Sequence, residues 1–357
     1  MITKVRIRNF RSLRNVTIEL ERLTVLVGPN ASGKSSILQG LDLLCKSFCS
    51  EQNDPQRAMN LEAEAVGAKS WGASDQVEFA CESHGTTYRH RTGSQVGHMG
   101  PRGKNAWDGK GRGTASSLDS EEWSEWVSKS ASDSPLPLSV FLQLEVSKLT
   151  STQPEPNMNP RLSVAMAPNG VGLHTALANM ALNDPDSWNQ LQADLRSIIP
   201  SIRRLRHTKI TSPGAAALLF DTIGAESLPA SQISEGTLIV LGLLTALYAP
   251  ERPNLVLLDD LDRGLHPKAQ KDLITLLRGL LASNPELQLV ATTHSPYMLD
   301  CVEAKEVRMT FLQQDGTTAC AALGSHAQYE KWKDEMTPGE MWSLFGEKWL
   351  VEQEARP

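Results

Sequence analysis

A glycine-rich segment near the start of the chain constrains its fold more than any other feature. Residues 28–35 read Gly-Pro-Asn-Ala-Ser-Gly-Lys-Ser and fit the pattern G-x-x-x-x-G-K-[ST] at every position. The apolar run at 23–27 predicts a buried strand, and the spacing of apolar residues at 36–44 predicts a helix. The backbone N–H groups of such a loop, together with the N-terminus of the helix, form a cradle for phosphate.

Two side chains of this phosphate loop add the charge and the metal ligand that a chain of phosphates needs. Lys34 supplies a mobile positive charge for the β- and γ-phosphates, and the Ser35 hydroxyl would ligate Mg²⁺. The structural alternative is a chance glycine-rich turn, but the strand before it and the helix after it favour the phosphate site. The segment therefore predicts that the chain binds a nucleotide with its magnesium ion.

The composition is that of a globular protein and limits the partners that the whole molecule can attract. The chain has 357 residues, which is room for one large domain or two ordinary ones, and a formal net charge of −6. Any contact with nucleic acid must therefore use a local basic face. Five irregularly spaced cysteines favour free thiols in a reducing cytosol, and no apolar run approaches the ~20 residues of a membrane span. We expect a cytoplasmic protein without a signal segment or a membrane contact.

Acidic and imidazole side chains follow two later apolar runs. Asp259 and Asp260 come directly after the run at 254–258, and His294 ends the run that starts at 287. Strand–helix alternation from residue 230 onward indicates a parallel sheet, and ligands bind beyond the carboxyl ends of parallel strands. Asp259 could then hold Mg²⁺ through water, Asp260 could orient or deprotonate an attacking water, and His294 could face the γ-phosphate. Acidic residues also cap strand-to-helix turns, which is the structural alternative for the pair.

Two further segments lie at expected helix starts. Residues 234–237 (S-E-G-T) precede an apolar helix at 238–247, and a hydroxyl residue followed by a glycine can form a second anion site there. The same pattern is common in helix capping, so the motif alone leaves both roles open. Residues 263–267 (R-G-L-H-P) end on a proline that suits the first turn of a helix predicted at 268–281.

The remaining segments predict smaller elements around this core. Alternating residues predict a β-hairpin over 2–27 and a second one over 75–92, which turns near His84. Gly, Ser, Lys and Arg dominate residues 93–135, which we interpret as an exposed and partly mobile insertion. Beyond it we expect a strand at 140–146 and helices at 171–180 and 188–199.

Taken in order, these motifs resemble the ABC-type ATPases, specifically the compact, coiled-coil-free members of the RecF/SMC/OLD-like AAA family. The shared order is the phosphate loop, S-E-G-T, the strand that ends in Asp-Asp, G-L-H-P and finally T-T-H-S-P. Residues 7–13 look like the family's first strand, and residues 169–173 look like its Asp-Gly-x-x-Leu segment. The tail at 337–342 and 346–350 resembles the end of the compact members, so the resemblance covers most of the chain.

The resemblance implies an α/β fold of the P-loop ABC/RecF type. Such a fold has a mostly parallel sheet, an antiparallel β-lobe and a helical subdomain. Residues 1–48 and 230–312 would form the ATPase core. Residues 49–229 would form an inserted β and helical lobe that includes the mobile loop at 93–135, and residues 313–357 a C-terminal segment that packs on the core.

The resemblance also implies that ATP·Mg²⁺ binds between two copies of the chain arranged head to tail. The phosphate loop of one copy and residues 234–237 of the other, the signature segment, would enclose the phosphates, and the turn at 263–266 would touch the opposite copy. The nucleotide-contacting residues would be Gly28, Pro29, Asn30, Ala31, Ser32, Gly33, Lys34, Ser35 and Ser36 in cis, and Ser234, Glu235, Gly236 and Thr237 in trans. The catalytic residues would be Lys34, Asp260 and His294. The metal would be served by Ser35, Asp259 and Gln143, the last as the candidate for the glutamine usual in such sites.

One strand end departs from the family pattern. The family usually has Asp-Glu-Pro-Glu or Glu-Glu-Pro-Glu where residues 259–262 of this chain read D-D-L-D. The catalytic glutamate is therefore replaced by Asp260, whose carboxylate reaches roughly 1.5 Å less far. Because misplacement by about an ångström can cost on the order of a hundredfold in rate, we expect slow basal hydrolysis of ATP.

Three functions are compatible with these features. The first is an ATP-switched dimer or higher oligomer that controls a separate effector, a nuclease or toxin, in bacterial anti-phage and genome defence. The second is a DNA-binding ATPase of repair or recombination type, whose basic residues at 99–113 or 203–209 would contact phosphates. The third is a nucleotide-gated scaffold with little hydrolysis. The structural alternative for both basic clusters is a solvated loop or helix face, and a zinc site at Cys81, His84, His90 and His98 is a further alternative.

Overall fold

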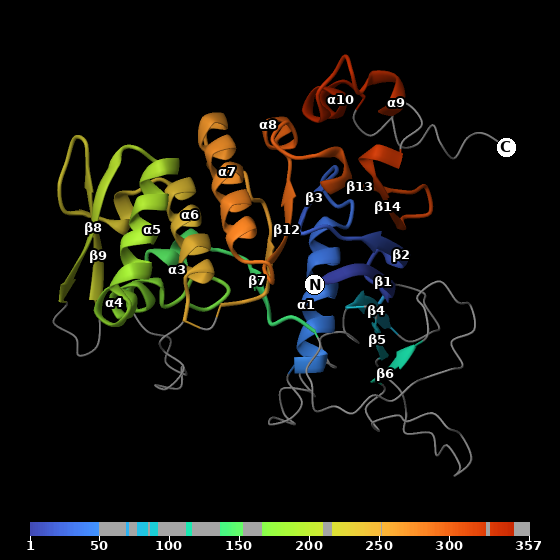
Figure 1. Cartoon of the computed structure of the whole chain (residues 1–357), viewed down its shortest axis with the longest axis horizontal. Coiled ribbons are helices and arrows are strands. Elements are labelled where there is room, and N and C mark those ends of the chain that lie inside the picture. Colours follow the sequence, from blue (N-terminus) through green and yellow to red (C-terminus); the bar gives the residue numbers. More distant parts are fainter. Residues whose placement is uncertain are drawn as a thin grey trace, which may run out of the picture. The chain divides into compact units, whose positions relative to one another are not determined.

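A computed structural model describes residues 1–49, 69–70, 77–84, 86–91, 112–115, 136–152, 166–209, 216–250, 252–325 and 329–345 of the chain. The chain divides into two compact units, and each is described by itself (Figure 1). Unit 1 comprises Met1–Ser139, Asn254–Asp259 and Asn284–Pro357, and unit 2 comprises Val140–Pro253 and Asp260–Ser283. The predicted domain limits stay a prediction. Most of the predicted insertion at 93–135 lies outside the described residues.

Unit 1 contains an antiparallel sheet that starts from the N-terminal hairpin. In β1 (Ile2–Phe10) and β2 (Leu13–Glu19), buried apolar residues alternate with more exposed ones, as in a strand with one face on the core. The sheet continues through β4 (Glu78–Ser83), β5 (Thr86–Arg91) and β6 (Arg112–Ala115) in the order β2-β1-β4-β5-β6. The strand pairs expected from the two predicted hairpins, β1 with β2 and β4 with β5, are confirmed.

The second sheet of unit 1 is mostly parallel and carries several of the motifs. Four of its strands are parallel neighbours: β13 (Val307–Leu312), β3 (Leu23–Val27), β12 (Gln288–Thr293) and β11 (Leu255–Leu258). A fifth strand, β14 (Thr318–Ala322), pairs antiparallel with β13, which gives the order β14-β13-β3-β12-β11. β3, β11 and β12 are buried along their whole length, as expected for parallel strands covered on both faces.

The helices of unit 1 connect and extend these sheets. α1 (Lys34–Cys49) leaves the phosphate loop and contacts strands of both sheets, and Gly40 permits this approach, since a Cβ there would lie 2.7 Å from Ile7 Cδ1. Late in the chain come α8 (Pro296–Leu299), α9 (Tyr329–Trp332) and α10 (Pro338–Phe345). α10 packs on α8, where the Gly339 N–H donates to Asp300 Oδ1 at 2.8 Å. Among all described helices, none is long and apolar enough to cross a membrane.

Unit 2 is mainly helical. The chain enters it through β7 (Ser139–Leu142) and α3 (Val146–Leu149), and α4 (Leu173–Asn183) and α5 (Pro185–Ile198) confirm the two helices predicted next. α6 (Glu235–Leu247) is buried on all sides from Gly236 onward, and α7 (Pro267–Ser283) follows it in the chain. α5 packs against both α6 and α7, and Figure 1 shows the three helices side by side. The small antiparallel sheet has the order β10-β9-β8, with bounds Leu228–Pro229, Ala216–Thr222 and Ile202–Lys209.

One predicted strand of unit 2 is too long. The strand expected at 140–146 ends at Leu142, and Val146 already begins α3. The backbone N–H groups of Gln143 and Glu145 instead donate to carbonyl oxygens at 168 and 169, at 3.0 and 3.1 Å. The segment therefore pairs with a loop that is remote in sequence, which local periodicity could not reveal.

The basic cluster at 203–209 lies on strand β8 rather than on a loop or a helix face. Arg206 donates to both carboxylate oxygens of Asp221 on β9, at 2.6 and 2.7 Å, and Arg204 approaches the same carboxylate at 3.5 Å. Two of the basic residues are thus paired across the small sheet. Apart from such local differences, the predicted α/β fold with a mostly parallel sheet, an antiparallel β-lobe and a helical part is confirmed.

Candidate functional site

The phosphate loop, Asp259 and His294 lie at one edge of the mostly parallel sheet of unit 1. The loop follows β3, His294 follows β12 and Asp259 follows β11, and these strands are consecutive neighbours. The carboxyl ends of parallel strands meet at the same edge of a sheet. The structure thus brings together three segments that the sequence analysis selected separately.

Lys34 is held inside the loop that carries it. Lys34 is 6% exposed. The ammonium group of its side chain donates to the carbonyl oxygens of Gly28 and Pro29, each at 2.8 Å. The loop reaches this shape through left-handed backbone at Ala31, with φ 63°, and at Gly33, with φ 97°. The buried positive charge therefore has acceptors within the loop that phosphate oxygens could replace.

Two glycines of the loop are required by close packing against β13 and β14. A Cβ at Gly28 would lie 2.2 Å from the Thr310 carbonyl oxygen, and a Cβ at Gly33 would lie 2.4 Å from Thr318 Oγ1. Real Cβ atoms do not approach neighbours that closely, so no larger residue fits without a shift of the strands. At these two positions the loop therefore meets the sheet through its backbone.

The loop residues predicted to contact nucleotide divide into outward and inward groups. Asn30, Ala31 and Ser35 are exposed and Pro29 is half-buried. The buried members are Gly28, Ser32, Gly33, Lys34 and Ser36. Ser32 shares a hydrogen bond of 2.6 Å with the Thr310 hydroxyl, so its side chain faces β13.

Three hydroxyl side chains that sequence reasoning missed support the loop. Thr310 on β13 bonds Ser32, as above, and Thr318 Oγ1 on β14 donates to Ser12 Oγ at 2.7 Å. The Thr318 N–H also donates to the Ser12 carbonyl oxygen at 2.8 Å. Because these residues come from distant parts of the chain and have ordinary strand or turn patterns, only the topology identifies them.

Asp259 is oriented by the neighbouring strand. The hydroxyl of Thr292, which is fully buried on β12, donates to Asp259 Oδ1 at 2.6 Å. The carboxylate is half-buried, whereas His294, two residues beyond Thr292, is exposed. Asp259 thus has a fixed oxygen and remains accessible at the sheet edge, which suits a ligand for a hard cation.

In unit 2, Ser234 caps helix α6. Its hydroxyl accepts from the Thr237 N–H at 3.4 Å and shares a hydrogen bond of 2.7 Å with the Thr237 hydroxyl. The capping role considered for this motif is therefore real. The other N–H groups of the first turn of this thirteen-residue helix also lie at the signature segment. An anion contact there is therefore compatible with the cap.

The signature segment contacts the turn before α7. Arg263 Nε lies 2.5 Å from Glu235 Oε1, and a Cβ at Gly236 would lie 2.3 Å from the Gly264 carbonyl oxygen. Arg263 also donates to the Leu144 carbonyl oxygen at 3.3 Å. Two motifs that are separated in sequence thus form one surface of unit 2.

Asp260 and Gln143 also belong to unit 2. Asp260 has a left-handed backbone with φ 54°, a conformation that Asp tolerates better than most residues and that is frequent at functional sites. Its carbonyl oxygen accepts from the Arg263 N–H at 3.0 Å, which closes the turn. Gln143 is exposed just after β7. The roles predicted for both residues stay predictions.

The alternative zinc site falls only partly on described residues. Cys81 is buried on β4, and His84 Nε2 lies 2.7 Å from the N-terminal amine of Met1. His98 lies outside the described residues. Within the described ranges, no group of three or more His, Cys, Asp and Glu side chains could hold a metal ion.

Two family models match different parts of the chain. The model described as "AAA domain, putative AbiEii toxin, Type IV TA system" matches residues 172–300, and the model described as "AAA ATPase domain" matches residues 1–81. The Septu protein PtuA of Bacillus thuringiensis is 38% identical over 61 residues, which is 17% of this chain and 15% of PtuA. The OLD nuclease of Thermus scotoductus is 41% identical over 44 residues, 12% of this chain and 8% of the nuclease. The chain therefore aligns with only a small part of the length of these relatives.

Solved structures resemble the whole chain in fold. The crystal structure of the SmcHead bound to the C-winged helix domain of ScpA has a TM-score of 0.57 at 14% identity, and the match covers 92% of this chain and 99% of that one. An Smc head domain with an extended coiled coil, bound to the C-terminal domain of ScpA derived from Pyrococcus furiosus, has a TM-score of 0.53 at 12% identity. That match covers 94% and 99% of the two chains. At such identities the likeness establishes the fold alone.

Proposed function

Because the chain belongs to the RecF/SMC/OLD-like family of ABC-type AAA ATPases, we propose that it is an ATP-driven switch in bacterial anti-phage defence. ATP·Mg²⁺ binding joins two copies head to tail, and slow hydrolysis separates them again. The dimer controls a separate effector protein, a nuclease or a toxin. The short matches to Septu PtuA and to an OLD nuclease support the defence setting.

One observation carries the nucleotide-binding part of this proposal. The phosphate loop, Asp259 and His294 follow three neighbouring strands at one edge of one sheet. The residues fit the ligand, since the ammonium group of Lys34 supplies a counter-charge and the packing of Gly28 and Gly33 on the sheet fixes the backbone of the loop. The Ser35 hydroxyl and the Asp259 carboxylate are oxygen donors of the kind that Mg²⁺ prefers. When bound, the ion would neutralise charge on the phosphates.

The signature segment supports the dimeric part of the proposal. Its Ser234 cap and its contacts with the turn before α7 bring backbone N–H groups and hydroxyls together on one surface of unit 2. A head-to-tail partner would place this surface against the phosphates of the other copy. His294 would act on the γ-phosphate of its own copy, and Asp260 would orient the attacking water.

Asp260 makes hydrolysis slow in this proposal. Its side chain is one methylene shorter than that of the glutamate usual in the family. Its left-handed backbone belongs to the turn that Arg263 closes. We predict that Asp260→Glu raises turnover by about tenfold or more, given the cost of an ångström of misplacement. Steady-state phosphate release from both proteins, at matched ATP occupancy, checks this. Faster turnover by the wild-type chain than by Asp260→Glu would contradict it.

The decisive experiment is phosphate release from purified protein with Mg²⁺·ATP, with and without linear duplex DNA. Lys34→Ala serves as the blank. Light scattering in the same samples reports ATP-dependent dimers, with Ser234→Arg as the test variant and the exposed Ser201→Arg as its matched control. We expect slow, DNA-independent turnover and dimers that Ser234→Arg abolishes. Clear stimulation by DNA would favour the repair-type alternative, and ATP-dependent dimers without turnover would favour the scaffold alternative.

A further inference from the structure

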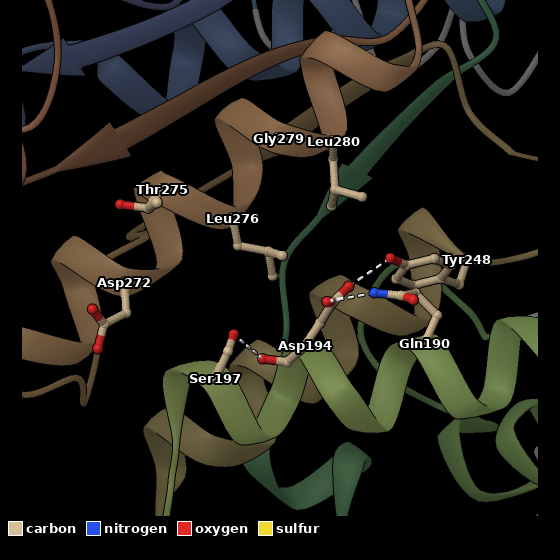
Figure 2. A pocket seen from close by; sticks show the side chains of 9 residues that line it. All are labelled: Gln190, Asp194, Ser197, Tyr248, Asp272, Thr275, Leu276, Gly279 and Leu280. Carbon is tan, nitrogen blue, oxygen red and sulfur yellow. Dashed lines mark hydrogen bonds between the residues drawn. The ribbon is translucent and has the colours of Figure 1, made fainter.

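A hollow of about 420 Å³ lies within unit 2, between α5 and α7 and next to Tyr248 at the end of α6. Figure 2 shows its walls: polar side chains of α5 and Tyr248 on one side, and one face of α7 on the other. Its volume falls in the range of small-ligand sites, roughly 300–1,000 Å³. None of its lining residues belongs to the segments assigned to nucleotide. The lining residues are Gln190, Asp194, Ser197, Tyr248, Asp272, Thr275, Leu276, Gly279 and Leu280.

The polar end of the hollow is built around Asp194. This residue is 7% exposed, and its carboxylate accepts from Tyr248 OH at 2.5 Å and from Gln190 Nε2 at 2.9 Å. Burial, with the hydrogen bond and charge of Asp194, raises the pKa of Tyr248, so the phenol remains a neutral donor. Figure 2 shows both hydrogen bonds converging on the carboxylate.

The charge of Asp194 is not neutralised by a neighbouring cation. Among the described residues, no basic side chain forms an ion pair with it, and Arg252 lies over the Tyr248 ring, 6.0 Å from its centroid. A buried carboxylate is costly unless it is paired, because hydrogen bonds from neutral donors replace its hydration only in part. The site would therefore gain most from a cationic ligand.

The α7 wall of the hollow is polar at Asp272, which pairs with Lys268 at 2.8 Å, and at Thr275, and it is apolar further along the helix. Leu276 and Leu280 lie one turn apart on α7 and are half-buried, and Gly279 stands between them on the same side. A Cβ at Gly279 would meet no atom within 4 Å, so the missing side chain leaves open space. Glycine in a helix interior costs about 1 kcal/mol relative to alanine, and here it keeps the hollow open.

We propose that this hollow is a binding site for an alkylammonium group, a primary amine on a short aliphatic chain. The ammonium binds the Asp194 carboxylate, and the methylenes lie along Leu276, Gly279 and Leu280. A guanidinium fits less well, because its planar fork needs a suitably directed free lone pair on both carboxylate oxygens at once, and each oxygen already accepts one hydrogen bond, whereas an ammonium needs only one such lone pair. A divalent cation fits less well too, because it requires several oxygen ligands and leaves the leucines without a partner.

Two sources offer an amine of this chemistry: a free polyamine, or a lysine side chain on a protein partner. The proposal does not rest on the proposed ATPase function, and its test uses no nucleotide. Calorimetric titration of the full chain with cadaverine and with spermidine represents the first source. Titration with Nα-acetyl-lysine N-methylamide represents the second, and 1-pentanol is the neutral control.

Two variants test the two ends of the hollow. Asp194→Asn removes the charge, and Gly279→Leu fills the open space while favouring the helix. Their matched controls are Asp186→Asn, an exposed carboxylate on the same helix, and Gly224→Leu, a glycine of unit 2 whose Cβ also meets nothing within 4 Å. Thermal unfolding of each variant verifies its fold. If Asp194→Asn fails to fold, Gly279→Leu carries the test.

We expect at least one amine probe to bind, with an affinity at least tenfold lower for Asp194→Asn and Gly279→Leu and unchanged for both controls. The tighter probe identifies the source: the free polyamines indicate a metabolite, and the lysine derivative indicates a protein side chain. Pentanol should bind at least tenfold more weakly than the best amine. Absence of amine binding at millimolar concentration, or binding that neither test variant weakens, would overturn the proposal.

Discussion

The phosphate loop of unit 1 and the signature segment of unit 2 are held by different kinds of contact. The loop is bonded to β13 through buried hydroxyls at Ser32 and Thr310 and is packed on Thr318 of β14. The signature is held by the Glu235–Arg263 ion pair, whose side chains are each 43% exposed, and by backbone contact at Gly236. Exposed ion pairs contribute about 0–1 kcal/mol, so this contact can exchange partners at little cost.

In the proposed dimer, this difference would make the phosphate-loop half of the nucleotide site rigid and leave the signature half able to adjust. A loop that binds phosphate gains from a fixed backbone, because nothing must be ordered when the ligand arrives. A surface that meets a second copy gains from contacts that reorganise.

Gly28→Ala should have the largest effect, because its Cβ would meet the Thr310 carbonyl oxygen at 2.2 Å. A backbone atom cannot rotate away, so we expect unit 1 to lose about 1–3 kcal/mol of stability and the chain to lose nucleotide binding. Denaturant unfolding and binding of a fluorescent ATP analogue measure both. Gly224→Ala, with open space around its Cβ, is the control. Unimpaired binding would show that the loop is less rigid than described.

Gly236→Ala should disrupt the signature segment and leave the phosphate loop intact. Its Cβ would lie 2.3 Å from the Gly264 carbonyl oxygen. This clash would push the signature segment away from the turn before α7. We expect nucleotide affinity within about twofold of wild type, because the loop is untouched, and loss of ATP-dependent dimers in light scattering. Gly279→Ala, a helix glycine of the same unit, is the control. Dimers that persist would remove the signature from the proposed interface.

Acid should destabilise unit 2 through His207 on β8. Burial, aided by nearby His174, lowers the pKa of His207 from its usual 6.5 to about 4. The folded state therefore favours the neutral ring. Its contribution to stability is complete above pH 6.5 and is lost as the pH falls from 6.5 towards 4. Hydrogen exchange should show α5 and β8 losing protection over this range, with a weaker pH dependence in His207→Gln. Equal dependence in the variant would place the acid-sensitive group elsewhere.

Thr318→Val should have the smallest effect of the series. The substitution keeps the shape of the side chain that packs on Gly33 and removes its hydrogen bond to Ser12. We expect a loss of about 1 kcal/mol in stability and a severalfold lower nucleotide affinity. Thr275→Val, on the exposed face of α7, is the control for β-branched replacement. A fold and affinity equal to wild type would mean that packing alone supports the loop.

The sequence predicted the parts of the site that depend on local pattern. The phosphate loop, the strand ends at Asp259 and His294, and the apolar helix that follows residues 234–237 each depend on residues next to one another in the chain. Parallel pairing then brings the strand ends together, because the fold class already fixes which ends of the strands meet.

Contacts between remote segments could not be predicted. Ser12, Thr310 and Thr318 have no distinguishing local pattern, and their importance comes from which strands are neighbours. The end of β7 at Leu142 could not be predicted for the same reason, since residue 143 bonds to a loop more than twenty residues away in the sequence. Gly236 and Gly264 belong to two motifs that the sequence identifies, but only the structure shows that the two residues contact each other.

Because β13 and β14 support the phosphate loop, the loop can reach its final structure only late in the synthesis of the chain. The Thr310 hydroxyl donates to the Val27 carbonyl oxygen across 283 residues of chain, and the Thr318–Ser12 bond spans 306. At ~5–20 residues per second, a ribosome needs roughly 15–60 s to make the intervening chain. A nascent polypeptide thus carries the glycine-rich motif long before it carries a finished loop, and premature termination before residue 307 would leave the motif without its supporting strands.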